Sequence, residues 1–416
     1  KRGLLGVRGE LFMQLAHPQK RLGPRSFFAC ALAINLLLIL SIDMYVPALP
    51  SMQRVFDVTE AYLNLTVFAF FVFSAVGVIM AGPVSDRFGR KPVLVFGCML
   101  FAASSLFCTL APTVEVLIVF RIGQALGYGA VVTIETALIK DSFDGNDLKL
   151  AMTALQSLII IGPAVAPFLG TFILTFSDWR GIFTLLTVCG FVALGLSLLI
   201  SETHPHASKA ERSQTGVGAA LGSMVSDIRI LMHDRKFSSL ALFMGIAGMP
   251  YFAFIAVVSY ILMDFFAVSY FEYSMIYAGA CLVTIAAPYV YVALSKRMSV
   301  RAILVLCVWL TAASFVMLAL FGTASPVLFL VAFVPYALAE GIVRPMAFVV
   351  LLDQPSSRVG AASSFSNFSY ALLTSFATVI ATLQWPNFIF GIAVLTGASV
   401  LVMAGLYAWG LRKKAD

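Results

Sequence analysis

The chain alternates between long apolar runs and short polar breaks. Most runs hold about 20 residues or more, which is the length a helix needs to cross the hydrocarbon core of a bilayer. The runs are continuously apolar rather than alternating, and this pattern excludes a closed barrel of strands. We therefore predict an all-α integral membrane protein with twelve transmembrane helices, at residues 26–48, 61–84, 92–112, 114–139, 150–176, 181–200, 238–262, 272–294, 301–322, 326–351, 362–384 and 387–410.

One polar stretch is much longer than the other breaks, and it divides the twelve runs into six and six. Duplicated halves of this kind place a substrate cavity between them near the middle of the membrane. A helix on the membrane surface is expected near residues 223–234. The predicted segments are an N-terminal tail (1–25), an N-terminal half (26–200), a cytoplasmic linker (201–237), a C-terminal half (238–410) and a C-terminal tail (411–416).

The composition supports this class and excludes several others. Hydrophobic residues make up 61% of the chain and charged residues only 11%, against about 25% charged in soluble domains. The six cysteines stand singly without a CxxC pair, so neither disulfides nor a zinc site is expected. The linker histidines His204 and His206 are not expected to bind a metal. No phosphate-binding loop and no basic stripe occur, which argues against ATP and nucleic acid as partners.

The basic residues indicate the orientation. Of the 27 lysines and arginines, 23 fall in the tails and in the breaks on one side of the membrane. Arg54 and Arg180 lie on the other side, and Arg121 and Arg344 lie inside runs. Positive charge collects on the cytoplasmic side of membrane proteins, so both termini are expected in the cytoplasm. The first run does not end in a small-residue cleavage site, so we expect no cleaved signal peptide.

Four segments resemble a known transporter family. The decapeptide GPVSDRFGRK, between the second and third runs, resembles the loop signature of the major facilitator superfamily. LSIDMYVPALP (40–50), DWRGIF (178–183) and LDQPSSRVGAASS (352–364) resemble the bicyclomycin and chloramphenicol efflux branch of its drug:proton antiporters. The resemblance implies the major facilitator fold and export of small apolar or amphipathic compounds in exchange for protons across a bacterial cytoplasmic membrane. We expect a monomer without a cofactor, driven by the proton gradient.

In this family the loop signature belongs to a charge network that latches the outward-open state. Mapped onto this chain, the latch comprises Gly82, Asp86, Arg87, Gly89, Arg90 and Asp141. Gly82 is expected to allow close helix approach or a tight turn, and Gly89 a positive φ where the chain reverses. The alternative is that these charges only set the topology.

The fifth run contains GPAVAPFLG, which resembles the antiporter motif of the family. Pro163 and Pro167 each remove a helix hydrogen bond, and Gly162 and Gly170 allow close packing. A bent helix at the interface between the halves is therefore expected. Ala166 and Thr171 stand where the motif has glycine.

Five ionisable residues lie inside runs, and each is a candidate for function because an isolated charge in the membrane is costly. They are Asp43, Arg121, Glu135, Glu340 and Arg344. Histidine is absent from the set, so proton coupling must depend on carboxylates. Asp43 can bind and release a proton if it faces water and a dry cavity in turn. The alternative is a structural acid bonded near Pro47.

Two of these residues share the fourth run. Arg121 begins R-x-x-Q-x-x-x-x-G, with Gln124, and resembles the proton-associated arginine of the family. It would hold an acid charged or orient a substrate, or else bond to carbonyls of the first run. Glu135 stands where the family usually has an apolar residue. It is a candidate second proton site or a site for cationic or polar substrates, unless it pairs with Lys140 near the cytoplasmic mouth.

The tenth run carries Glu340 and Arg344, four residues apart on one helical face, where an ion pair is favoured. We expect these two side chains either to line the substrate cavity or to stabilise the packing of the helix. Tyr251, Phe254 and Tyr289 are candidates for an apolar substrate pocket. Two rival functions remain: export of a polar metabolite such as an amino-acid-like or sulfonamide-like solute, and a membrane enzyme or sensor without transport. No catalytic constellation supports an enzyme.

Overall fold

The computed structural model describes residues 19, 22–203, 226, 228–351 and 359–411. The N-terminal half consists of α1 (Pro24–Asp43), η1 (Val46–Ala48), α2 (Leu49–Phe56), α3 (Glu60–Phe88), α4 (Arg90–Thr109), α5 (Val114–Ser142), α6 (Gly145–Leu174) and α7 (Trp179–Leu199). The C-terminal half consists of α10 (Arg235–Ser259), η2 (Tyr260–Phe265), α11 (Tyr270–Ser295), α12 (Val300–Phe321), α13 (Pro326–Leu351), α14 (Val359–Ala381), α15 (Phe388–Leu406) and η3 (Tyr407–Leu411). Helices make up both halves, and the residues described here form no β-strand.

The predicted all-α fold with twelve transmembrane helices is confirmed. Within the described ranges, ten helical segments are long and apolar enough to cross a membrane. The other two are α6 and α14, whose described apolar parts are shorter. The first segment runs from Pro24 to Phe56 and breaks after Asp43 into η1 and α2. Pro47 and Pro50 lie at this break, because proline lacks the N–H that a continuous helix requires there.

The short polar breaks supply the helix ends. A side-chain oxygen at the residue before the helix accepts a hydrogen bond from a first-turn backbone N–H, which satisfies a donor that the helix itself cannot. Ser269 and Glu272 form a reciprocal capping box at the start of α11. The other helices begun in this way are α3, α5, α7, α10, α12 and α15, capped by Thr59, Thr113, Asp178, Asp234, Ser299 and Asn387.

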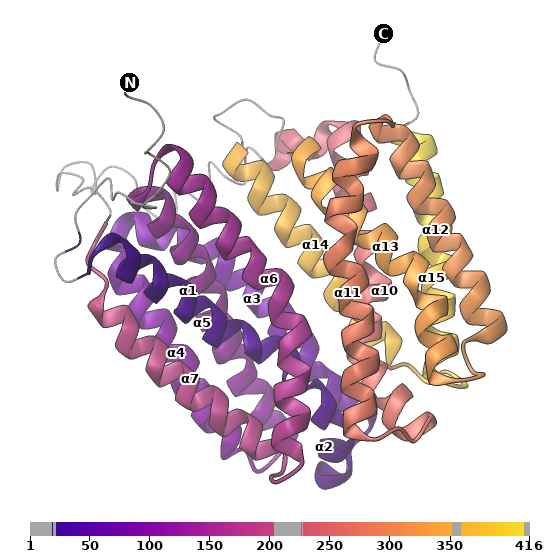
Figure 1. Cartoon of the computed structure of the whole chain (residues 1–416), viewed down its shortest axis with the longest axis horizontal. Coiled ribbons are helices and arrows are strands. Elements are labelled where there is room, and N and C mark those ends of the chain that lie inside the picture. Colours follow the sequence, from indigo (N-terminus) through magenta and orange to yellow (C-terminus); the bar gives the residue numbers. More distant parts are fainter. Residues whose placement is uncertain (1–18, 20–21, 204–225, 227, 352–358, 412–416) are drawn as a thin grey trace, which may run out of the picture.

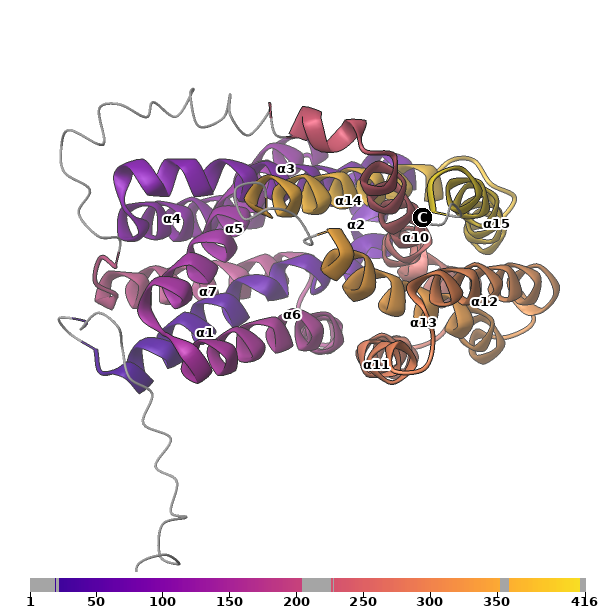
Figure 2. The same ribbon diagram turned by 90° about the horizontal axis from the view of Figure 1, so that it is seen from above.

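Two bundles of helices stand side by side (Figure 1), and two helix pairs join them. In the view of Figure 2, α3 packs against α14 along one edge, and α6 packs against α11 along the other. Both pairs come from opposite halves of the chain. The interface between the bundles is therefore formed in part by α3, α14, α6 and α11.

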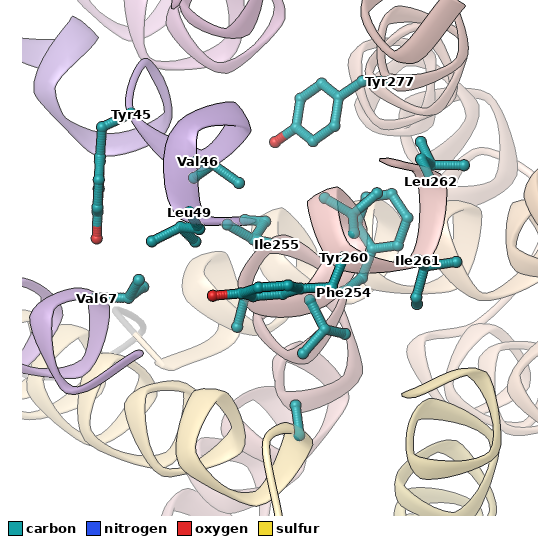
Figure 3. Close-up of a cluster of buried hydrophobic side chains, with 14 of the residues drawn as sticks. Tyr45, Val46, Leu49, Val67, Phe254, Ile255, Tyr260, Ile261, Leu262 and Tyr277 are labelled. Carbon is teal, nitrogen blue, oxygen red and sulfur yellow. The ribbon is translucent and has the colours of Figure 1, made fainter. Parts of the chain in front are cut away.

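The hydrophobic cores show that the halves are joined at one end. One core contains residues of both halves, including Val46, Leu49, Ile255 and Tyr260. Figure 3 shows this cluster, in which η1 and α2 meet α10 and η2. Two further cores each belong to one half, around Phe101 in the first and around Met346 in the second. We call the shared end the closed end, and the other, where α1 begins and η3 ends, the terminal end.

Part of the linker lies within the described residues. Residues 228–233 are helical and precede α10, inside the range in which a linker helix was predicted. The remainder of the predicted linker helix, and most of the LDQPSSRVGAASS segment before α14, fall outside the described residues.

Candidate functional site

Asp43 ends α1 directly before Met44 and Tyr45, which belong to the shared core of the closed end. Its side chain is only 1% exposed, and its Oδ1 has no hydrogen-bond partner among the described residues. No ion pair of Asp43 occurs in this part of the chain either. A buried carboxyl group without a cation is costly as an anion, so it must bind a proton or a ligand donor when it is closed off from water.

Aromatic residues of the C-terminal half belong to the shared core that begins directly after Asp43. Tyr273 and Tyr277 belong to the same core as Met44, which follows Asp43 directly, and Tyr251 packs against that core. The hydroxyls of Tyr273 and Tyr277 are buried without a described hydrogen-bond partner. Phe254 stacks on Tyr277 at 6.0 Å and on Phe333 at 4.5 Å between ring centroids. The acid at the end of α1 therefore borders a core to which the other half contributes an aromatic wall formed by Phe254, Tyr273, Tyr277 and Phe333.

Arg121 is a buried brace between α5 and α1. Its Nη1 donates to the carbonyl oxygen of Ser41 at 3.2 Å and to Gln124 Oε1 at 2.6 Å. The guanidinium lies 4.2 Å from the ring centroids of both Tyr45 and Phe70, an arrangement that stabilises a cation without an acid. The bond to Ser41 is the contact with the first span that we named as the structural alternative. Arg121 thereby holds the backbone two residues before Asp43.

Glu135 joins α5 to α1 by a bond that the sequence did not predict. Asn35 Nδ2 donates to Glu135 Oε2 at 2.7 Å, and both side chains are buried. The partner proposed as the alternative, Lys140, forms no ion pair with it. Glu135 Oε1 and Asn35 Oδ1 have no partner in the described chain, so this pair retains hydrogen-bonding capacity inside the N-terminal half.

The predicted ion pair between Glu340 and Arg344 is wrong. Glu340 Oε1 accepts a hydrogen bond of 2.8 Å from the hydroxyl of Tyr370 on α14. The guanidinium of Arg344 lies 5.0 Å from the centroid of the same tyrosine ring. A neighbouring helix has thus supplied both a donor for the acid and an aromatic face for the cation. Glu340 is buried and Arg344 is exposed.

The pocket tyrosines differ in their surroundings. Pro250 interrupts the hydrogen bonds of α10, and Tyr336 of α13 bridges the gap: its hydroxyl accepts from the Tyr251 N–H at 2.8 Å and donates to the Ala247 carbonyl oxygen. Tyr251 is therefore fixed beside the aromatic wall. Tyr289, in contrast, is 76% exposed and has no ring contact or hydrogen bond within the described residues, so it takes no part in this cluster.

The structure brings three charges of the predicted latch together. Arg90 Nη1 lies 2.6 Å from Asp86 Oδ1, and Arg90 Nε lies 3.2 Å from Asp141 Oδ2 at the end of α5. Arg90 also donates to the hydroxyl of Ser85. Arg87, beside them, stacks on Phe88 with 5.5 Å between its guanidinium carbon and the ring centroid. Arg90 thus ties the ends of α3, α4 and α5 to one another.

A further acid completes this cluster. Glu202 follows α7, and its two carboxylate oxygens accept from the backbone N–H groups of Arg90 at 2.8 Å and Lys91 at 3.1 Å. A carboxylate at the start of α4 is favoured by the helix dipole. Gly89 has the expected positive φ of 99°, and a Cβ there would also approach Glu202 to 2.5 Å. The expected close approach at Gly82 is wrong: it lies within α3, and a Cβ there would meet nothing within 4 Å.

The antiporter-motif helix α6 contacts both α1 and α11. A Cβ on Gly162 would press on Ile39, and one on Gly170 would collide with the Met44 carbonyl oxygen. The glycines therefore allow close packing on α1 in the same half rather than on the other half. Contact with the other half comes from Thr171, whose hydroxyl lies 2.6 Å from that of Ser274 on α11. Pro163 and Pro167 lie within α6 between the two glycines.

Comparisons with known proteins identify the family. A model described as Major Facilitator Superfamily matches residues 31–261, which is more than half of the chain. The chain belongs to the major facilitator superfamily. This facilitator is accordingly a multi-pass membrane transporter and not an enzyme.

Its relatives differ in how much of the chain they match. An uncharacterised MFS-type transporter of Bacillus subtilis, YdgK, is 26% identical over 384 residues, covering 90% of this chain and 92% of that protein. The multidrug resistance protein MdtL of Escherichia coli O157:H7 is 34% identical over 185 residues, covering 44% of this chain and 47% of that protein. The crystal structure of a D-xylose-proton symporter matches with a TM-score of 0.72 at 16% identity, over 91% of this chain and 97% of that chain, which shows a shared fold.

The site of this facilitator contains several residues that its sequence did not point to. They are the bonding partners of the intramembrane charges and of the loop signature: Asn35, Ser41, Glu202, Ser274, Tyr336 and Tyr370. Each lies on a different helix or segment from the residue with which it forms a hydrogen bond. In the described part of the chain, no three metal-ligating side chains lie close enough to hold an ion.

Proposed function

We propose that this facilitator is a proton-coupled antiporter that exports small apolar or amphipathic compounds across a bacterial cytoplasmic membrane, with both termini in the cytoplasm. In this orientation the closed end faces the outside, and the two separate cores lie toward the cytoplasm. The described conformation is then open toward the inside. Exchange requires that the halves part at the closed end and meet at the terminal end.

The observation that carries the proposal is the position of Asp43. Its carboxyl group is buried, has no cation partner among the described residues, and lies next to the core that both halves share and that must open. Opening the closed end gives this group access to outside water, from which it takes a proton. After the halves rock into the described conformation, the group is closed off from the outside and buried, and a substrate that binds from the cytoplasm favours the release of its proton.

Arg121 acts in this scheme by positioning. It is held by two aromatic rings and by the Ser41 carbonyl oxygen, so it fixes the last turn of α1 while leaving Asp43 without a permanent counter-ion. A permanent ion pair would keep the acid charged and stop it from exchanging protons. Antiport also requires that proton and substrate weaken one another's binding, as reciprocal linkage demands.

The proton gradient is sufficient for useful export. One proton moving across 100 mV supplies about 2.3 kcal/mol. Because a tenfold concentration ratio corresponds to about 1.4 kcal/mol, this energy can maintain a substrate gradient of about fortyfold. The multidrug resistance protein MdtL, similar over 44% of the chain, supports efflux as the direction.

A second candidate is export of a polar metabolite, and one observation favours it. An exposed guanidinium at Arg344 is an unusual feature of a membrane-spanning helix and suits an acidic solute better than a neutral drug.

Proton release from detergent-purified protein tests the proposal. A panel of amphipathic drugs that includes chloramphenicol, and a panel of amino-acid-like solutes, are added to weakly buffered protein in the presence of a pH indicator. We expect at least one compound to release protons from the wild type and none from Asp43→Asn. Release that is equal in both proteins would remove Asp43 from the mechanism, and no release by any compound would contradict antiport.

A further inference from the structure

Two tyrosines of the C-terminal half bury their hydroxyl groups in the shared core without a hydrogen bond. Tyr260 lies in η2 and is 2% exposed, and Tyr277 lies in α11 and is 1% exposed. Neither hydroxyl has a hydrogen-bond partner among the described residues. Both tyrosines belong to the core to which the other half contributes Val46 and Leu49. Two polar groups are therefore enclosed by the apolar packing that closes this end.

Both hydroxyls point across the boundary between the halves. In Figure 3 the Tyr277 hydroxyl points from α11 toward Val46 of η1. The Tyr260 hydroxyl points from η2 toward Leu49 of α2 and Val67 of α3 in the same view. All three of these aliphatic residues are buried members of the shared core. The N-terminal half thus presents hydrocarbon where each hydroxyl requires a partner.

Other tyrosine hydroxyls near this core are satisfied within their own half. The hydroxyl of Tyr45 lies 3.4 Å from that of Thr66, and both residues belong to the N-terminal half. Tyr336 forms its two hydrogen bonds to the backbone of α10, within the C-terminal half. Such bonds remain intact when the halves move as units. The two hydroxyls at the boundary differ, because their surroundings change when the halves part.

Closing this end costs free energy at each of these hydroxyls. A phenol that is buried without a new hydrogen bond loses its bonds to water without replacement, although its ring still gains from burial. When the halves part, water reaches both hydroxyls again. Phenylalanine would bury the same ring without this cost. The closed end is therefore less stable than a wholly apolar core of the same shape would make it.

We propose that Tyr260 and Tyr277 destabilise the closed end and so favour its opening to the outside. The inference rests on the alternating access of the proposed function, but not on the residue that carries the proton. An exporter must leave the inward-open conformation in every cycle. Apolar packing holds the halves together at this end, and the two hydroxyls limit how stable the packed state becomes.

The distance between spin labels at Val55 of α2 and Phe265 of η2 tests the inference, because both positions are exposed at the closed end. The purified protein without substrate should show a short distance for the closed conformation and a longer one for the open conformation. Tyr260→Phe and Tyr277→Phe should each lower the ratio of open to closed molecules by about fivefold or more. The double variant should lower the ratio by the product of the two factors.

The matched control is Tyr289→Phe, because this tyrosine also lies on α11 but is 76% exposed, so its loss of a hydroxyl should keep the wild-type ratio. An unchanged or higher ratio in Tyr260→Phe and Tyr277→Phe would overturn the inference, as would a wild type without the longer distance. The measurement uses neither a substrate nor a proton gradient. A lowered ratio without proton release by any compound would therefore reject antiport alone, and proton release with an unchanged ratio would reject this inference alone.

Discussion

At the scale of the residue, the bond between Asn35 and Glu135 shows how a polar pair is accommodated in the membrane. The amide donates to the carboxylate at 2.7 Å, and neither side chain is reached by water. Removing one partner leaves the other buried without a hydrogen bond, which costs more than losing the bond itself. The contributions of the two side chains to the free energy of unfolding are therefore coupled.

A double-mutant cycle measures this coupling. Asn35→Val and Glu135→Leu should each destabilise the protein in detergent, and the double variant should be more stable than the sum of the two effects implies, by about 1–3 kcal/mol. The readout is the midpoint of unfolding in denaturant. As a control, the cycle between Asn35→Val and Glu340→Gln, in opposite halves, should be additive. Additivity in the first cycle would contradict the pairing.

The sequence predicted which residues carry charge inside the membrane but not what they bond to. Helical periodicity gives the face on which Glu135 or Glu340 lies, whereas Asn35 and Tyr370 belong to other helices whose packing depends on the whole fold. The four-residue spacing predicted a pair between Glu340 and Arg344 because it considers one helix alone. In the structure Glu340 instead accepts a hydrogen bond from Tyr370. Nothing in a single sequence distinguishes this residue among the 13 tyrosines.

At the scale of the element, α10 is shaped by a proline and a hydroxyl from α13. Pro250 breaks the helix hydrogen bonds, and Tyr336 accepts from Tyr251 and donates to Ala247 in their place. The sequence predicted the spans to within a few residues, because length and apolarity determine them. It did not predict the short α2, since the apolar run continues through the prolines at the closed end.

Tyr336→Phe tests the bridge in α10. It deletes one oxygen, leaves a backbone donor and acceptor unpaired, and should lower the free energy of unfolding by about 1–3 kcal/mol. Amide hydrogen exchange at Tyr251 should also accelerate. The matched control is Tyr260→Phe, since the buried hydroxyl of Tyr260 has no described partner and its loss should cost little. Equal effects of the two substitutions would argue against the bridge.

At the scale of the whole molecule, the closed end is held mainly by apolar packing. The shared core around Val46, Leu49 and Ile255 excludes water (Figure 3). The ion pair between Arg54 and Asp264 spans the same end at 3.3 Å, but its side chains are 67% and 42% exposed. Exposed pairs contribute at most about 1 kcal/mol. An end closed in this way can open at a modest cost, as alternating access requires.

The hydrogen bond between Thr171 and Ser274 adds to this closure. Thr171→Val removes a bond of about 1 kcal/mol between the halves and should raise the population open at this end by roughly fivefold. Spin labels at Val55 and Phe265, both exposed at the closed end, would report the longer distance. Thr175→Val is the control, because that hydroxyl bonds only within α6. An unchanged distance distribution in Thr171→Val would show that the bond does not restrain the halves.

The central claim is that Asp43 carries the proton that drives export, and active transport tests it most directly. Everted membrane vesicles with an acidic interior should accumulate, in labelled form, a compound that releases protons from the purified wild-type protein when the vesicles contain that protein. Vesicles with Asp43→Asn should not accumulate it, yet should still exchange labelled for unlabelled compound down its gradient. Accumulation by Asp43→Asn equal to that of the wild type would contradict the account.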